Sequence, residues 1–151
     1  MSGPTAPPAA GPAPRAWPRA WIVFCDNTEL AWLRLLRPGF RHCFAVLHDG
    51  QRWIAIDPLA TRLEVTVPPL EADFDLPGWF AGRGHTVIAA AVRRDSGRPA
   101  PLGPFTCVET CKRLLGLRAR FVVTPWQLYR HLGGRDETAA APATLALATR
   151  P

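Results

Sequence analysis

The sequence lacks the features that mark membrane proteins and secreted disulfide frameworks. Its 151 residues contain no run of 18 or more apolar residues, so no transmembrane segment is expected. The first twenty residues also lack the apolar core of a secretory signal. We therefore expect a cytoplasmic location, where the four cysteines are thiols rather than disulfides.

Lysine is nearly absent, since all but one of the 18 basic residues are arginine. The formal net charge of +6 and the pI of about 10.1 would suit a nucleic-acid partner. The arginines are scattered rather than clustered, however, and a bias toward Arg, Ala, Gly and Pro is typical of a GC-rich genome. We therefore expect no nucleic-acid partner. The opposite interpretation, RNA or DNA binding through arginines, predicts a steep loss of affinity with salt.

The cysteines do not have the spacing of metal ligands. They are Cys25, Cys43, Cys107 and Cys111, and no pair has the C-x₂-C form. A zinc site that combines three of them with His42 is disfavoured, because adjacent residues 42 and 43 of a strand point to opposite faces. We expect no metal and no cofactor.

The composition is that of one globular domain, with 48% hydrophobic and 20% charged residues. Residues 1–20 hold six prolines with Ala and Gly, and we expect a disordered or extended arm that could contact a protein partner. The domain is expected over 21–132. From 133 to 151 the chain turns to Ala, Thr and Pro, which predicts a flexible tail.

The hydrophobic pattern predicts an α+β fold, in which a small antiparallel sheet packs against helices. Strands are expected at 21–25, 42–47, 52–57, 63–67, 86–92 and 120–123. Helices are expected at 28–36, at 107–115 and at 125–131, and residues 70–84 are expected to form a loop with one helical turn.

The central element is a hairpin of 42–47 and 52–57. Asp49-Gly50 suits a two-residue type I′ turn, so that paired positions sum to 99. His42 and Asp57 would then be direct cross-strand neighbours, on the order of 5 Å apart at Cβ. Both faces of the hairpin are apolar, so we expect it to be covered on both sides.

A helix start lies at Thr106, which is followed three residues later by Glu109 in the Ser/Thr-x-x-Glu pattern of a capping box. Cys107 is then the first helical residue, and Gly116 ends the helix. A thiol at a helix N-terminus has a lowered pKa, because unpaired N–H groups and the positive end of the helix dipole favour the thiolate. The alternative is a buried structural cysteine.

Together these elements provide a nucleophile in Cys107, a base in His42 and an orienting carboxylate in Asp57. Two other interpretations remain open: His42 as a core histidine whose ring is merely hydrogen-bonded, and Asp57 as a strand end before Pro58. The histidine precedes the cysteine by 65 residues. The usual papain-like order is the reverse, and a circular permutation would give the order found here.

The motifs that carry a family resemblance are Trp21-Ile22-Val23-Phe24, Arg41-His42-Cys43-Phe44-Ala45-Val46, Asp49-Gly50, Phe105-Thr106-Cys107-Val108-Glu109 and Thr124-Pro125-Trp126-Gln127-Leu128. In this order they resemble the circularly permuted, papain-like cysteine hydrolases of the NlpC type, which include lecithin–retinol acyltransferase-like proteins. The resemblance covers roughly residues 20–132.

The resemblance implies a permuted papain-like fold and a hydrolase or acyltransferase that attacks an amide or ester through a thioester. It implies Cys107 as nucleophile, His42 as general base and Asp57 as the third residue, with no cofactor. Substrates would be peptides, amides or lipid esters, including cell-wall peptides, and the protein could be phage-associated. The alternative is a catalytically inactive papain-like domain that serves in binding or in phage-related assembly.

Overall fold

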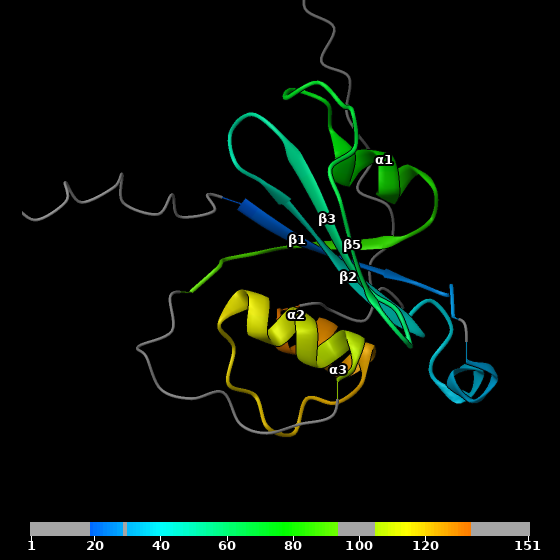
Figure 1. Ribbon diagram of the computed structural model, residues 1–151. Coiled ribbons are helices and arrows are strands. Elements are labelled where there is room, and N and C mark those ends of the chain that lie inside the picture. Colours follow the sequence, from blue (N-terminus) through cyan, green and yellow to red (C-terminus); the bar gives the residue numbers. More distant parts are fainter. Residues whose placement is uncertain (1–18, 29, 94–104, 134–151) are drawn as a thin grey trace, which may run out of the picture.

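A computed structural model describes residues 19–28, 30–93 and 105–133. It contains a five-stranded antiparallel sheet in the order β4-β3-β2-β1-β5 (Figure 1). The strands are β1 (Arg19–Cys25), β2 (His42–His48), β3 (Trp53–Pro58), β4 (Leu63–Thr66) and β5 (Thr86–Ala90). The helices are α1 (Leu76–Gly82), α2 (Cys107–Leu115) and α3 (Pro125–His131), with a 3₁₀-helix η1 (Ala31–Leu35). The predicted α+β class is confirmed.

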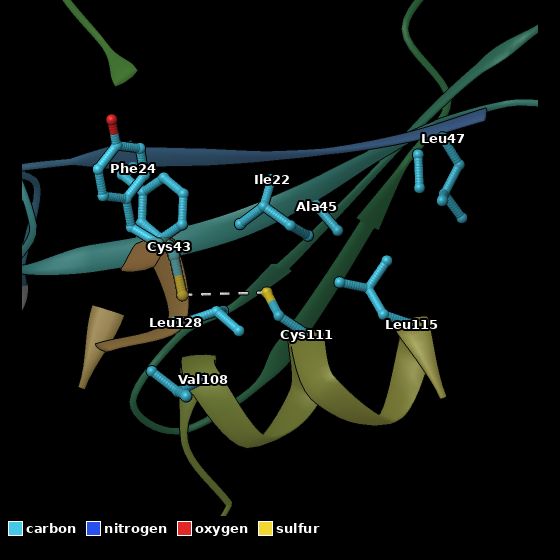
Figure 2. Close-up of a cluster of buried hydrophobic side chains, with 11 residues drawn as sticks. Ile22, Phe24, Cys43, Ala45, Leu47, Val108, Cys111, Leu115 and Leu128 are labelled. Carbon is cyan, nitrogen blue, oxygen red and sulfur yellow. Dashed lines mark hydrogen bonds between the residues drawn. The ribbon is translucent and has the colours of Figure 1, made fainter. Parts of the chain in front are cut away.

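Helices cover both faces of the sheet, with α2 and α3 on one side and α1 on the other (Figure 1). Alternate residues of β1, β2, β3 and β5 enter the two cores, as the pleat requires, whereas β4 is exposed. On the side of α2, the buried side chains include Ile22, Phe24, Cys43, Ala45, Leu47, Val108, Cys111, Leu115 and Leu128 (Figure 2). On the side of α1 they are Val23, Val46, Trp53 and Leu76. The central hairpin is therefore covered on both faces, as predicted.

The helix α2 begins and ends where the sequence predicts. The Thr106 hydroxyl accepts the Glu109 N–H at 3.1 Å, and Gly116 ends the helix with a φ of 67°. A side chain at Gly116 would also strike the Arg93 carbonyl, because an added Cβ would lie 2.2 Å from that oxygen. Glycine is therefore required there for its backbone conformation and for its lack of a Cβ.

The predicted register of the hairpin is wrong by two residues. Observed pairs such as Ala45–Ile56 and His48–Trp53 sum to 101, which makes Gly50 and Gln51 the central turn residues. The reason is the Asp49 side chain, whose Oδ1 accepts the N–H groups of Gln51 at 2.8 Å and Arg52 at 2.7 Å. This role places the aspartate before the turn, and Gly50 then supplies the positive φ of 97°.

Several predicted boundaries also change. The expected helix at 28–36 is only the short η1, and the expected strand at 120–123 lies outside the five strands of the sheet. The region 70–84 contains α1, which is capped by the Asp75 carboxylate. The strand β1 begins at Arg19, before the expected domain boundary. The rest of the expected arm, 1–18, and the tail from 134 lie outside the described residues.

Within the part of the chain that the structure describes, no helix has the length and apolar character needed to cross a membrane.

Candidate active site

The three side chains singled out from the sequence come together at one end of the sheet. His42 is the first residue of β2, Asp57 lies at the end of β3, and Cys107 is the first residue of α2. They arrive from elements far apart in the chain because α2 packs across β2, with Val108, Cys111 and Leu115 against the face that carries Cys43, Ala45 and Leu47 (Figure 2). This packing brings the N-terminus of α2 to the start of β2.

The Nε2–H of His42 donates to Oδ1 of Asp57 at 2.7 Å. The predicted register made these two residues direct cross-strand neighbours, and in the structure they are not. Extending the observed register places Asp57 opposite Phe44, one diagonal step from His42. A shift by two residues preserves the face on which each side chain lies, so the carboxylate still reaches the ring. Nδ1 is therefore the ring nitrogen that remains for Cys107.

The thiol of Cys107 lies against the first two residues of β2. Hydrogen bonding to the Cys43 side chain is the largest influence on its pKa, and burial opposes it. Hydrogen bonding to His42, the charge of His42 and the backbone N–H of Cys43 lower the pKa further, to about 5. Cys107 is therefore a thiolate at neutral pH.

The pKa of His42 is raised to about 10. Burial of the ring acts in the opposite direction, but it is outweighed by the hydrogen bonds to Asp57 and Cys107 and by the charges of both. A protonated His42 and an ionised Cys107 thus coexist at neutral pH as an ion pair. A histidine buried in this state, with 9% of its surface exposed, requires the two anions beside it.

Cys43 contributes to the lowered pKa of Cys107, and the sequence did not indicate this role. Alternation along the strand was expected to point Cys43 away from His42, and it is fully buried. Its thiol nevertheless contacts both Cys107 and Cys111. The spacing of four between the two helical cysteines was the available signal, because it places both on one side of α2.

The N-terminus of α2 can also stabilise negative charge. The Thr106 hydroxyl takes the Glu109 N–H, and the ladder of the helix begins with the Thr110 N–H on the Thr106 carbonyl. The N–H groups of Cys107 and Val108 lie outside this ladder. Among the described residues they have no partner within the helix, so they can donate to the oxyanion that forms when the sulfur attacks a carbonyl carbon.

Cys107 and His42 both line a pocket of about 300 Å³. The polar contribution comes from Asn27, Thr28 and Thr106. The remaining lining residues are mainly apolar: Leu30, Trp32, Leu33, Pro58, Leu59, Ala60 and Phe105. The pocket thus places an apolar group of a ligand next to the sulfur.

Over the described ranges 19–28, 30–93 and 105–133, no group of three or more His, Cys, Asp or Glu side chains is arranged to hold a metal ion. The predicted absence of a cofactor remains a prediction.

Neither a protein-family model, nor a curated protein, nor a solved structure matches this chain. The function is therefore inferred from the geometry of the site.

Proposed function

We propose that this protein is a cysteine-dependent hydrolase or acyltransferase that acts on an amide or ester bond through a thioester. The observation that carries the proposal is the ion pair of Cys107 and His42, with His42 held by Asp57 at 2.7 Å, in the lining of an apolar pocket. We also propose that the fold is a permuted papain-like fold of the NlpC type. The antiparallel sheet flanked by helices and the order of histidine before cysteine support it.

The first half of the reaction forms the acyl-enzyme. The Cys107 thiolate attacks the carbonyl carbon, and the N–H groups at the start of α2 hold the negative oxygen of the tetrahedral intermediate. The protonated His42 then gives its proton to the departing amine or alcohol, and the thioester remains on Cys107.

The second half of the reaction releases the acyl group. Neutral His42 takes a proton from water or from another acceptor, which attacks the thioester and expels the thiolate. Asp57 stays ionised throughout and stabilises the imidazolium each time it forms. The cycle returns His42 and Cys107 to the ion pair.

The pocket favours a substrate with an apolar group next to the reacting carbonyl. The side chains of Leu30, Leu33 and Leu59 line it, and Trp32 and Phe105 contribute aromatic surface. Among the lining residues that the structure describes, His42 and Cys107 are the ones with titratable side chains. Peptides with an apolar residue and lipid esters both meet this requirement.

The test uses p-nitrophenyl butyrate and a peptide p-nitroanilide with an apolar residue before the scissile bond. Intact mass spectrometry after rapid quenching should detect one acyl group, located on Cys107 by proteolysis. Cys107→Ala should abolish this adduct. Cys25→Ser is the matched control, because Cys25 is buried and burial, the largest influence, raises its pKa to about 11. An adduct that persists in Cys107→Ala, or none with any substrate, would contradict the proposal.

A second function, binding or assembly without catalysis, is favoured by the apolar surface around the pocket. Trp32 is 64% exposed, Phe105 64% and Leu35 91%. A surface of this kind suits a protein partner. The two functions differ in the chemistry of Cys107, since a binding domain has no need of a thiolate. Alkylation of Cys107 at pH 6 no faster than that of a free thiol would favour the binding function.

A further inference from the structure

Three of the four cysteines form a connected group, which we name the thiol cluster: Cys43, Cys107 and Cys111. The Sγ atoms of Cys43 and Cys111 lie 3.9 Å apart, in the core between β2 and α2 (Figure 2). Cys43 is also the hydrogen-bond partner of Cys107. Cys43 is therefore between the other two, and all three are free thiols.

The members of the thiol cluster differ in their access to solvent. Cys107 is half-buried and lines the pocket, whereas the exposed fractions of Cys43 and Cys111 are 0% and 1%. A dissolved oxidant therefore meets Cys107 first. Oxidation of cysteine follows thiolate character and exposure, so Cys107 is the residue that such a reagent attacks.

We propose that Cys43 and Cys111 form a redox relay that restores Cys107 after its oxidation by a hydroperoxide. In the first step the Cys107 thiolate attacks a peroxide oxygen and one proton is taken up, which gives a sulfenic acid and releases the alcohol or water. The Cys43 thiol then attacks the Cys107 sulfur, which forms a Cys43–Cys107 disulfide and releases water. In the last step the Cys111 thiol loses its proton and attacks the Cys43 sulfur, and Cys107 leaves as the thiolate, so the proton taken up in the first step is returned.

The net change is the loss of two hydrogens from Cys43 and Cys111 and the two-electron reduction of one hydroperoxide. The final step is favoured because a thiol of low pKa is the better leaving group, and the pKa of Cys107 is lowered. The sulfur atoms of Cys43 and Cys111 must approach from 3.9 Å to a bond length of about 2.05 Å. The two sulfur atoms must therefore approach by about 2 Å for the disulfide to form.

The relay is independent of the proposed hydrolase activity, because it requires no substrate other than the peroxide. Its consequence for the site is that Cys107 is not carried on to a sulfinic acid, which is irreversible in most proteins. The oxidising equivalent is stored instead in a buried disulfide between β2 and α2.

The test exposes the reduced, full-length protein to hydrogen peroxide and follows it by intact mass, by disulfide mapping and by iodoacetamide labelling of Cys107. We expect the wild type to lose two hydrogens, to contain a Cys43–Cys111 disulfide and to keep a reactive Cys107. Cys111→Ser should trap the Cys43–Cys107 disulfide and lose the labelling. Cys43→Ser should gain two oxygen atoms on Cys107. Cys25→Ser should behave as the wild type.

The measurements on the wild type decide the proposal even if a core variant fails to fold, and Cys43→Ala and Cys111→Ala provide apolar replacements. A wild type that gains two oxygen atoms on Cys107 while Cys43 and Cys111 remain thiols would overturn the relay. A Cys43–Cys107 disulfide that persists in the wild type would overturn the role of Cys111. Neither result depends on whether the protein hydrolyses an ester.

Discussion

The helices α2 and α3 begin with nearly the same sequence pattern, yet their N-termini differ. In α3 the capping box is complete: Thr124 accepts the Gln127 N–H, and the Gln127 side chain accepts the N–H groups of Val123 and Thr124. Pro125, the first helical residue, has no N–H to satisfy. The N-terminus of α3 therefore offers fewer N–H groups to a ligand than that of α2.

In α2 only half of the box is formed. Thr106 accepts the Glu109 N–H, but the Glu109 carboxylate pairs with Lys112 at 2.8 Å and Arg113 at 3.0 Å. The first helical residue is Cys107 instead of a proline. Two basic residues in the last turn thus keep a carboxylate away from the thiolate. The partner of the third helical residue thus decides whether such a helix start is occupied by its own cap or leaves N–H groups open for chemistry.

The largest difference between the two helix starts is expected when the first helical residue of each is replaced. Cys107→Ala should reduce acyl transfer from the p-nitrophenyl ester by on the order of 10³-fold or more, since the proposed nucleophile is lost. The equivalent change in α3, Pro125→Ala, should leave activity within about twofold, because that helix start takes no part in the site. Steady-state kinetics on both variants, with circular dichroism to confirm folding, measure the difference. Equal activities of the two variants would remove α2 from the mechanism.

The charges around the open helix start are expected to set the pH dependence. Cys107 is protonated below a pKa of about 5 and His42 loses its proton above a pKa of about 10, so kcat/KM should rise through the first value and fall through the second. His42→Ala should cost about 10²- to 10⁴-fold in rate. It should also move the midpoint of Cys107 alkylation upward, toward about 8.5.

Asp57→Asn measures the contribution of Asp57 to the pKa of His42 separately from that of Cys107. Removing the carboxylate should lower the pKa of His42, so the alkaline limb of the profile should move below about 10. An unmoved alkaline limb would show that Asp57 only ends a strand.

The ion pairs of Glu109 with Lys112 and Arg113 are expected to contribute mainly to the stability of the fold. Lys112 donates to the carbonyls of Ala119 and Val122 at 3.0 Å each, in addition to its pair with Glu109, and its side chain is 7% exposed. Lys112→Met should reduce the free energy of unfolding by about 2–3 kcal/mol, because two carbonyls and a carboxylate lose a charged donor. Arg113→Met, at the more exposed partner, should cost about 1 kcal/mol or less. Urea denaturation of both variants compares them, and equal losses would contradict a special role for Lys112.

The smallest effect is expected from the caps that the two helices share. Thr106→Ala and Thr124→Ala should each cost about 1 kcal/mol of stability. Only Thr106→Ala should also slow the alkylation of Cys107, because only that helix start borders the site. A kinetic effect of similar size in Thr124→Ala would mean that the capping residues act through global stability alone.

The sequence predicted best what depends on near neighbours. The start of α2 at Cys107 and its end at Gly116 follow from residues within one turn, and both were found where expected. The register of the hairpin was missed because Asp-Gly is compatible with two turns, and the Asp49 side chain selects between them. The face on which His42 and Asp57 lie was nevertheless correct, since it depends only on alternation.

Features that depend on contacts between residues far apart in the sequence were not predicted. Cys43 contacts Cys107 only because α2 packs on β2, and no local pattern specifies that pairing. The expected strand at 120–123 failed for a similar reason: β-branched and aromatic residues favour a strand only beside a partner strand. Phe121 and Val123 are instead 85% and 63% exposed.

The buried position of Lys112 also provides a way to measure local opening of α2. It is the chain's only lysine, and in the folded protein its amine is held by a carboxylate and two carbonyls. An amine-reactive ester can modify this side chain only when α2 separates from the segment 119–122. The rate of acylation at this single position therefore reports the free energy of that local opening. A protein almost without lysine thus contains its own probe of the helix that carries the proposed nucleophile.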